Sequence, residues 1–362
     1  MDIVVVGAGI IGAAVADRLA ADGAAVTVID AERPGSGTSG SSFAWLNSNE
    51  KLPRHYHDLS VRAIDAWARL AAGFGHPPWY APTGNVIWTE AGGLSERLQR
   101  LREWDYPAEE ITTRQLADLE PSLRPPATAQ IASFPGEGFV HGKQAVDALL
   151  ARARTAGARL IKAQAVVEPD AVRLPDGSRI PADAIVCCAG WRTARLLEPL
   201  GVDVPLVPPD APGSTAPCLI VTTTGSAPVR RPVHTPGIGL RPAWGGGLRL
   251  EAGDINDVVD LHTPAAELEG YGRELVHRAA GVVDGFMAAD SRSTLCVRPL
   301  PLDGHPVVGW LPELPKLYLA VTHSGITLAP ELARLVTADI LRNGGDELDP
   351  YRLVGRDRRG AR

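Results

Sequence analysis

Three glycines and one aspartate near the N-terminus have the spacing of a site for a bound dinucleotide. Gly7, Gly9 and Gly12 directly follow the apolar run 3–6, and Asp30 ends a second apolar run about 20 residues further on. In a strand–turn–helix unit the first glycine permits the tight turn, the second lets the backbone approach a pyrophosphate, and the third lets helix and strand pack closely. The Asp30 carboxylate is placed to accept hydrogen bonds from ribose hydroxyls. The sequence therefore predicts a dinucleotide-binding unit.

Two other interpretations of these residues remain open. The glycines could belong to an ordinary βα turn, and the largely apolar stretch 3–16 could be a signal peptide. No basic segment precedes that stretch, it is too short to span a bilayer, and glycines interrupt it, all of which argue against a signal peptide. Asp30 argues against NADP, because its carboxylate would repel the extra phosphate. The glycine pattern alone leaves both NAD and FAD open.

A second candidate anion-binding segment follows directly after Asp30. Residues 32–49 are rich in glycine, serine and threonine. Such a loop offers backbone N–H groups and hydroxyls to an anion. A surface linker is the alternative, but the position right after the second nucleotide-binding strand favours a phosphate site.

Composition and charge narrow the class of protein. The 362 residues are 45% hydrophobic and 22% charged, as in soluble globular proteins, and no stretch reaches transmembrane length. A net charge of −6 gives no reason to expect nucleic acid or an anionic membrane as a partner. Cys187, Cys188, Cys218 and Cys296 lack the spacing of a metal site, so we expect no metal and a cytoplasmic enzyme.

The elements that must position these residues follow from hydrophobic periodicity. Residues 200–260 are dense in proline and glycine and contain short β-type runs, which predicts an antiparallel sheet inserted between α/β parts. Residues 356–362 are expected to fray. The pattern predicts strands over 3–6, 25–29, 85–88, 184–188 and 317–321, and helices over 56–72, 94–104, 113–119, 145–156 and 328–343, the last with Pro330 in its first turn.

From Asp2 to about Asp349 the chain resembles the D-amino-acid oxidase family of flavoproteins, especially its glycine oxidase and sarcosine oxidase branches. Arg298-Pro299 and the segment Asp303–Gly309 are the most specific matches. In two places the chain departs from the family: Ser324 alone separates His323 from Gly325, where glycine oxidases have a longer loop, and Asp30 replaces the usual glutamate. The other matching motifs are the glycine pattern, Gly37–Ser42, Thr83–Asn85, Leu119–Pro121, Val140–Gly142, Ile185–Trp191 and His323–Pro330.

The resemblance implies FAD as the cofactor and an α/β fold with two intertwined domains. A doubly wound, Rossmann-type FAD-binding domain would comprise residues 1–80, 138–210 and 300–362. An interleaved antiparallel-sheet substrate domain would comprise residues 81–137 and 211–299. The residues that the resemblance places at the cofactor are Gly7, Gly9, Ile10, Ile11, Gly12, Asp30, Ala31, Arg33, Thr38, Ser39, Ser41, Ser42, Val166, Ala189, Gly190, Trp191, Arg298, Ser324, Gly325, Ile326, Thr327 and Leu328.

The resemblance also implies catalytic candidates. Arg298 stands where glycine oxidase has an arginine that binds the substrate carboxylate, and Arg249 stands where sarcosine oxidases have a lysine for oxygen activation. The alternative is a surface or interdomain arginine for Arg298 and an arginine on the surface of a strand for Arg249. His323 either lines the flavin or satisfies backbone groups at a helix start. Cys296 matches the cysteine to which sarcosine oxidases tether flavin, but we expect FAD to be bound without a covalent bond.

The resemblance implies oxidation of a small amino acid or N-alkyl amino acid by hydride transfer to flavin N5, giving an imine, with O₂ or another acceptor. Two enzyme alternatives remain, a dehydrogenase that passes electrons to a quinone or a partner protein and a tailoring oxidase of a larger amine. A third alternative is a non-catalytic FAD-binding subunit of a complex. The sequence does not name the substrate or the oligomeric state.

Overall fold

The computed structural model describes residues 1–342 and 344–353, so the expected end of the last helix at Asn343 and the expected fraying of 356–362 lie outside the described residues. The chain forms two compact units. Unit 1 contains 1–40, 142–209 and the described residues from 297 onward, and unit 2 contains 41–141 and 210–296. The expected domains differ mainly at residues 41–80, which cluster with unit 2 and not with the nucleotide-binding part.

Unit 1 is built on a sheet whose central strands are buried on both faces. Val4, Val5 and Val6 of the first strand are each at most 5% exposed, which explains why the run is apolar throughout instead of alternating. All strand pairs in this sheet are parallel except β19–β20. The strand order is β19 (Val307–Leu311), β20 (Leu314–Val321), β13 (Ala184–Cys187), β1 (Asp2–Val6), β2 (Ala25–Asp30) and β9 (Arg159–Lys162).

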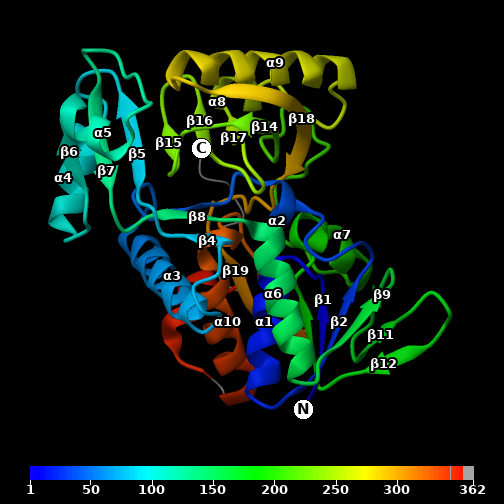
Figure 1. The fold of residues 1–362 in the computed structure, drawn as a ribbon. Coiled ribbons are helices and arrows are strands. Elements are labelled where there is room, and N and C mark those ends of the chain that lie inside the picture. The colour runs from blue at the N-terminus through cyan, green and yellow to red at the C-terminus, as the bar shows by residue number, and fades with distance from the viewer. Residues whose placement is uncertain (343, 354–362) are drawn as a thin grey trace. The chain divides into compact units, whose positions relative to one another are not determined.

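Different layers cover the two faces of this sheet. Three helices, α1 (Ile10–Ala21), α6 (Gly142–Thr155) and α10 (Gly325–Arg342), pack side by side (Figure 1). The opposite face packs against a three-stranded antiparallel sheet, β10–β11–β12, and the short helix α7, so the fold is Rossmann-type without long helices on that face. The bounds of the remaining elements of unit 1 are α2 (Thr38–Ser41), β10 (Val166–Val167), β11 (Ala171–Arg173), β12 (Arg179–Pro181), α7 (Thr193–Leu197) and the 3₁₀ segments Gly190–Arg192, Glu198–Leu200 and Asp346–Tyr351.

The last helix begins earlier than the sequence pattern predicts. Helix α10 starts at Gly325, so the prediction of a start at Leu328 with Pro330 in the first turn is wrong. Pro330 lies in the second turn, where its missing N–H group removes one intrahelical hydrogen bond. The early start brings Ser324 and Gly325 to the N-terminal end of the helix.

Unit 2 contains an eight-stranded sheet that is mixed, not purely antiparallel as predicted. Strand β15 runs parallel to β5. The two strands come from the two separate chain segments of unit 2, 210–296 and 41–141, which meet at this pair in the sheet. The strand order is β18 (Met287–Val297), β14 (Pro217–Ser226), β17 (Leu248–Glu251), β16 (Gly239–Pro242), β15 (Val233–His234), β5 (Asn85–Thr89), β7 (Gln130–Phe134) and β6 (Glu109–Ile111).

One face of this sheet carries the apolar core of unit 2. Leu240, Leu248 and Leu250 join a buried cluster with Leu275 and Ala279 of helix α9 (Figure 1). The remaining elements of unit 2 are β3 (Trp45–Leu46), α3 (Arg54–Ala72), β4 (Tyr80–Ala81), α4 (Ser95–Glu103), α5 (Thr113–Leu119), β8 (Gly138–Val140), α8 (Gly253–Asn256) and α9 (Ala265–Val282). Helices α3, α4 and α5 confirm the helices predicted over 56–72, 94–104 and 113–119, with ends shifted by up to two residues.

Strand β18, which precedes Arg298, is largely exposed. It is an edge strand of eleven residues, and Cys296 is its one buried side chain. Asp290 and Arg292 are exposed on it, as expected for an edge that must not pair with another chain.

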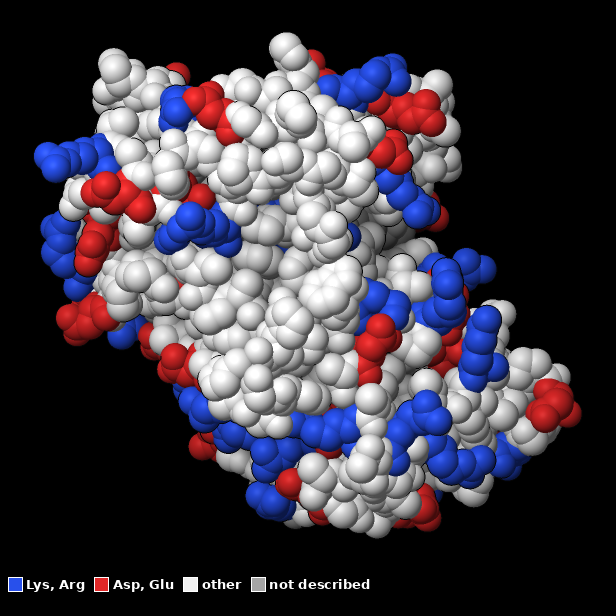
Figure 2. Space-filling view, in the orientation of Figure 1, with Lys and Arg blue, Asp and Glu red and all other residues white. Residues whose placement is uncertain are grey.

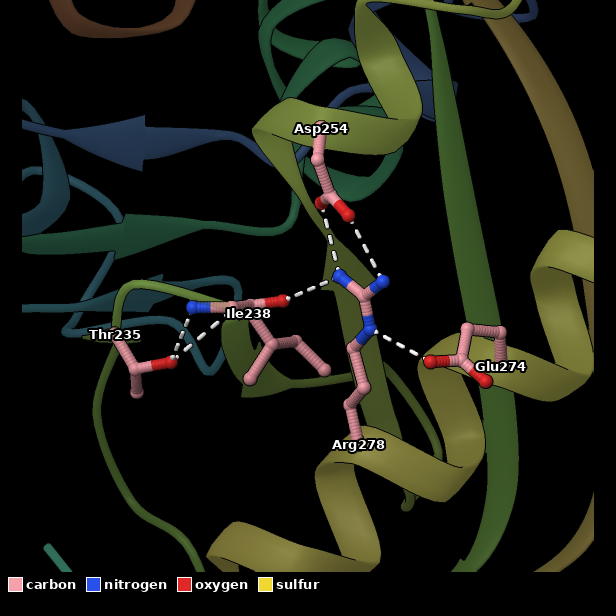
Figure 3. Close-up of polar contacts among 6 residues, drawn as sticks. Thr235, Ile238, Asp254, Glu274 and Arg278 are labelled. Atoms are coloured by element: carbon pink, nitrogen blue, oxygen red, sulfur yellow. Dashed lines mark hydrogen bonds and ion pairs between the residues drawn. The ribbon is translucent and has the colours of Figure 1, made fainter. Parts of the chain in front are cut away.

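Arg278 joins three elements at the surface of unit 2 (Figure 3). Its guanidinium forms two hydrogen bonds to the Asp254 carboxylate, at 2.9 and 2.8 Å, and one to Glu274 at 3.0 Å. It also donates to the Gly237 carbonyl at 3.0 Å, in the turn where Thr235 accepts from the N–H groups of Gly237 and Ile238. One side chain thus connects α9, α8 and the turn before β16.

A buried carboxylate organises another part of unit 2. Glu137 is 1% exposed and accepts hydrogen bonds from the N–H groups of Ser48 and Asn49 and from the side chains of Asn49, Asn85 and Tyr106, at 2.9–3.2 Å. These donors offset part of the desolvation of the carboxylate, and burial still raises the pKa of Glu137 above its ordinary value. We therefore interpret Glu137 as a structural residue.

On the face shown in Figure 2, Lys and Arg gather in a band across the lower part of the view, and elsewhere on this face they are interspersed with Asp and Glu. Within residues 1–342 and 344–353, no helix is long and apolar enough to cross a membrane. In the same part of the chain no group of three or more His, Cys, Asp or Glu side chains could hold a metal ion.

Candidate functional site

The glycine-rich turn after β1 needs two of its three glycines for reasons internal to the protein. Gly7 has φ +106°, and a Cβ there would lie 2.4 Å from the Cys188 carbonyl oxygen. A Cβ at Gly12 would lie 1.9 Å from the Gly7 carbonyl oxygen. Gly9 differs, because its φ is −74° and its Cβ would meet only the Ser39 hydroxyl, at 3.3 Å. The protein alone therefore does not explain why residue 9 is glycine.

Asp30 fixes the geometry of this turn. One carboxylate oxygen accepts a hydrogen bond from the Ala8 N–H group at 2.6 Å, and the other accepts from the Glu32 N–H group at 2.8 Å. Each oxygen still has acceptor capacity, because a carboxylate offers about four lone-pair positions. Asp30 is half-buried at the end of β2, so it can hold the turn and also accept from a ribose hydroxyl.

The N-termini of three helices meet at the carboxyl edge of the unit 1 sheet. The Ser39 hydroxyl accepts from the Ile10 N–H group at 2.9 Å, in the first turn of α1. A Cβ at Gly142, the first residue of α6, would lie 2.1 Å from the Ser39 carbonyl and 2.9 Å from Ile326 of α10. A Cβ at Gly325 would contact Ile11 at 3.6 Å. Each helix brings the positive end of its dipole to this place.

This arrangement fits a dinucleotide. The chain reverses its direction through the sheet between β1 and β13, and open α/β sheets bind ligands at such a switch point. The N–H groups of Ile11 and Gly12 have no carbonyl one turn earlier within α1, so they remain for an anion. A glycine at position 9, whose Cβ would meet only the Ser39 hydroxyl, leaves backbone that a pyrophosphate can approach.

The other predicted cofactor residues are distributed over both units. Thr38 donates its hydroxyl to the Val297 carbonyl at 2.5 Å. Ala189 and Gly190 follow β13, with Gly190 at φ +60°, and Ala31 and Arg33 are exposed after β2. Val166 in β10 is 42% exposed. Trp191 is half-buried, Ser324, Thr327 and Leu328 are buried at the start of α10, and Ser41 and Ser42 cluster with unit 2.

The catalytic candidates belong to different units. Arg298 follows β18 directly and is half-buried, one residue beyond the carbonyl that Thr38 binds. His323 is half-buried in the turn between β20 and α10. Both residues belong to unit 1, and Arg249 belongs to unit 2.

Arg249 is not the surface arginine that the alternative interpretation assumed. Its Nη1 donates to the Ser42 carbonyl at 2.6 Å, and burial lowers the pKa of its guanidinium. Directly opposite, on β16, lies Arg241, which is 1% exposed. Arg241 was missed by the sequence analysis. The sequence did contain an indication of this pair. Arg241 and Arg249 lie at equal distances before and after the loop Ala243–Gly247, so a hairpin closed by this loop places them opposite each other.

Aromatic rings and one histidine surround this arginine pair. The Arg241 guanidinium lies 5.0 Å from the ring centre of Phe139 and 5.7 Å from that of Phe43. His141 lies between Phe139 and Trp244, with ring centres 5.2 and 5.0 Å away. Burial, followed by the charges of Arg241 and Arg249, lowers the pKa of His141 to about 3, so the imidazole is neutral at physiological pH.

Cys296 lies in a small apolar cluster with Phe43, Cys218 and Ile220 and is 0% exposed. All four cysteines are buried thiols that form no disulfide bond. The packing is that of a core thiol, which favours the prediction of a cofactor without a covalent bond.

Three comparisons bear on the chain as a whole. A family model described as FAD dependent oxidoreductase matches residues 2–339. The chain is 30% identical over 391 residues to "Uncharacterized oxidoreductase YurR" of Bacillus subtilis (strain 168), with 97% of this chain and 98% of that protein covered. It is 27% identical over 375 residues to a glycine oxidase of Geobacillus kaustophilus (strain HTA426), with 98% and 96% covered.

The fold has a close match among solved structures. The crystal structure of glycine oxidase from Geobacillus kaustophilus matches with a TM-score of 0.82 over 98% of this chain and 99% of that one, at 24% identity.

Proposed function

The chain belongs to the family of FAD-dependent oxidoreductases, and we propose that it oxidises the C–N bond of a small amino acid or N-alkyl amino acid to an imine. The observation that carries this proposal is the meeting of the α1, α6 and α10 N-termini at the glycine turn, which fits FAD. The glycine oxidase named above supports an amino acid as the substrate.

In this proposal the protein binds FAD and the substrate, and FAD carries out the oxidation. Bound FAD supplies the acceptor for a hydride from the substrate α-carbon. The N–H groups of Ile11 and Gly12 would hold the pyrophosphate, and Asp30 would bind a ribose hydroxyl. The N-terminus of α10, from Ser324 to Leu328, would place positive dipole density at the isoalloxazine ring.

Three side chains have proposed roles toward the substrate and the electron acceptor. Arg298 would bind the substrate carboxylate, because a guanidinium forms paired hydrogen bonds to both carboxylate oxygens. Arg249 would provide a fixed positive charge that stabilises the negative charge developing on O₂. His323 would contact the flavin ring from the turn before α10.

The acceptor in this proposal is O₂ or another small acceptor, and the location is the cytoplasm. Cys187 and Cys188 are adjacent, buried and free, which suits a reducing compartment. Cell fractionation with an antibody against the chain tests this location.

Anaerobic mixing of the holoenzyme with a panel of amines tests the function. Loss of the oxidised-flavin absorbance with glycine, sarcosine or another amino acid is expected, and O₂ consumption in the same samples separates an oxidase from a dehydrogenase. The proposal is rejected if no amino acid reduces the flavin while dithionite does.

A further inference from the structure

Thr322 carries a buried hydroxyl group for which the protein supplies no hydrogen-bond partner. The residue is 2% exposed, and among the described residues no group donates to or accepts from its Oγ1. A buried hydroxyl without a partner is unfavourable, because folding removes its hydrogen bonds to water. Most buried hydroxyls in native proteins do have a partner, so the surroundings of Thr322 indicate what that partner is.

The side chain of Thr322 leaves the sheet on the face that α1, α6 and α10 cover. Leu319 and Val321 of β20 belong to the apolar cluster on the opposite face, with residues of β10, β11 and α7. Tyr318, on the helix-covered face, donates its hydroxyl to Asp339 of α10 at 2.7 Å. Because side chains alternate along a strand, Thr322, the residue after Val321, points to the same side as Tyr318.

Thr322 lies at the carboxyl edge of the unit 1 sheet, where α1 and α10 begin. The parallel register of β13 and β20, continued by three residues past its last pair, brings Thr322 level with Gly190. Three residues after Thr322, a Cβ at Gly325 would lie 3.6 Å from Ile11 in the first turn of α1. The hydroxyl therefore belongs to the place where two helix N-termini face the predicted dinucleotide.

The strand order indicates which part of FAD reaches this place. Strand β1 lies between β2 and β13, and β20 follows β13 on the side away from β2. Asp30, which would bind the ribose of the adenosine half, ends β2. With the pyrophosphate at the start of α1, the flavin half would extend to the other side of β1, over the ends of β13 and β20.

We propose that Thr322 is a further cofactor-binding residue, whose hydroxyl forms a hydrogen bond to a polar group of the flavin half of FAD. This inference rests on the proposed function for the orientation of FAD, with its adenosine ribose at Asp30. FAD then satisfies a hydroxyl that the protein leaves unsatisfied. Thr322 should therefore contribute to the affinity for FAD and not to the stability of the FAD-free protein.

Calorimetric titration of the FAD-free protein with FAD tests this role. Thr322→Val keeps the shape of the side chain but removes the hydroxyl, so its affinity for FAD should fall about tenfold, which corresponds to about 1.4 kcal/mol. Thr322→Ser keeps the hydroxyl and should bind FAD within about threefold of the parent. In the absence of FAD, Thr322→Val should raise the midpoint of thermal unfolding by about 2 °C, because it removes an unsatisfied polar group.

Thr337→Val is the matched control variant. Thr337 is 1% exposed, and its hydroxyl also has no hydrogen-bond partner among the described residues. It lies about three turns after the start of α10, on the order of 18 Å from the cofactor end of the helix. Thr337→Val should therefore gain thermal stability as Thr322→Val does, but it should bind FAD as the parent does.

ADP serves as the control ligand, because it carries the adenosine ribose and the pyrophosphate but no flavin. Thr322→Val should bind ADP within about twofold of the parent. A loss of affinity for ADP as large as the loss for FAD would overturn the assignment to the flavin half.

Three further results would overturn the inference. They are parent-like FAD affinity in Thr322→Val, a loss that Thr322→Ser does not restore, and a lower unfolding midpoint of FAD-free Thr322→Val, which would make the hydroxyl a structural group. None of these results affects the proposed oxidation. If the affinities change as expected but no amino acid reduces the flavin of the parent, the proposed function fails and this inference stands. If Thr322→Val does not fold, the comparison of Thr322→Ser with Thr322→Ala decides.

Discussion

A single added methyl group should have different effects at Gly9 and at Gly12, so alanine substitutions at these two positions form a matched comparison. Gly9→Ala should fold, because its Cβ meets only a movable hydroxyl at 3.3 Å, but its affinity for FAD should fall at least about tenfold as the Cβ occupies pyrophosphate space. Gly12→Ala should destabilise the FAD-free protein by about 3 kcal/mol or more, because its Cβ would lie 1.9 Å from a carbonyl oxygen.

Denaturant unfolding of FAD-free protein and calorimetric titration with FAD separate these two effects. A Gly9→Ala protein that binds FAD as the parent does would show that no cofactor atom approaches this residue.

Arg298 is the second test at this scale. Arg298→Lys keeps the charge but loses the planar fork, so about tenfold more amino acid should be needed to reduce the flavin by half. Arg298→Ala should need about a hundredfold more, since it leaves a carboxylate without its counter-ion at a half-buried position. Arg292→Ala on the exposed part of β18 is the control. Parent-like concentration dependence in both Arg298 variants would make Arg298 structural.

At the scale of elements, Arg278 connects α9 to α8, and its contribution to the free energy of unfolding should depend on pH. Arg278→Gln should lower the free energy of unfolding by about 1–2 kcal/mol near pH 7, because its carboxylate partners Asp254 and Glu274 are 59% and 49% exposed and such pairs are screened by solvent. The hydrogen bonds from Arg278 lower the pKa of Asp254 in the folded protein. The ion-pair contribution is therefore complete above the ordinary aspartate pKa of about 3.9 and disappears as the pH falls through the lowered value.

Urea unfolding of parent and Arg278→Gln between pH 7 and pH 3 measures this convergence. A difference that stays constant to the lowest pH would assign the effect to the Gly237 hydrogen bond and to packing.

Local elements were predictable from the sequence where one segment determines its own structure. The β1–turn–α1 unit follows from Gly7, Gly9 and Gly12, because Gly7 and Gly12 answer local steric needs of the turn and the helix. The start of α10 at Gly325 was not predicted. Proline is common in the first turn of a helix, so Pro330 suggested a later start, whereas it lies in the second turn. Arg241 was missed because its burial depends on the register of β16 against β17, which pairing and not composition determines.

At the scale of the whole molecule, the state of the cofactor after unfolding is the clearest test. Cys296 is 0% exposed among Phe43, Cys218 and Ile220, so acid or urea should release all the flavin from the chain, and Cys296→Ala should retain the parent FAD content. Filtration of the unfolded protein measures the released fraction. Flavin that stays on the unfolded parent chain but not on Cys296→Ala would show a covalent bond.

The general architecture was predictable, but the extent of each part was not. The sequence and the family resemblance predicted a Rossmann-type part and an inserted sheet, and the structure confirms both. The family resemblance assigned residues 41–80 to the FAD-binding domain, whereas in the structure they cluster with residues 81–141 in unit 2. The parallel β5–β15 pair joins segments almost 150 residues apart, and no local pattern encodes such a contact.

The interleaving of the chain has a consequence for its synthesis. Strand β1 leaves the ribosome first, but the strands that complete its sheet, β20 and β19, lie within residues 307–321. At about 5–20 residues per second, the apolar run Ile3–Val6 waits on the order of tens of seconds for those strands. A nascent chain that ends near residue 300 should therefore bind no FAD and should depend on chaperones to shield its N-terminal segment. The glycine turn that is easiest to find in the sequence is, during translation, among the last sites to become functional.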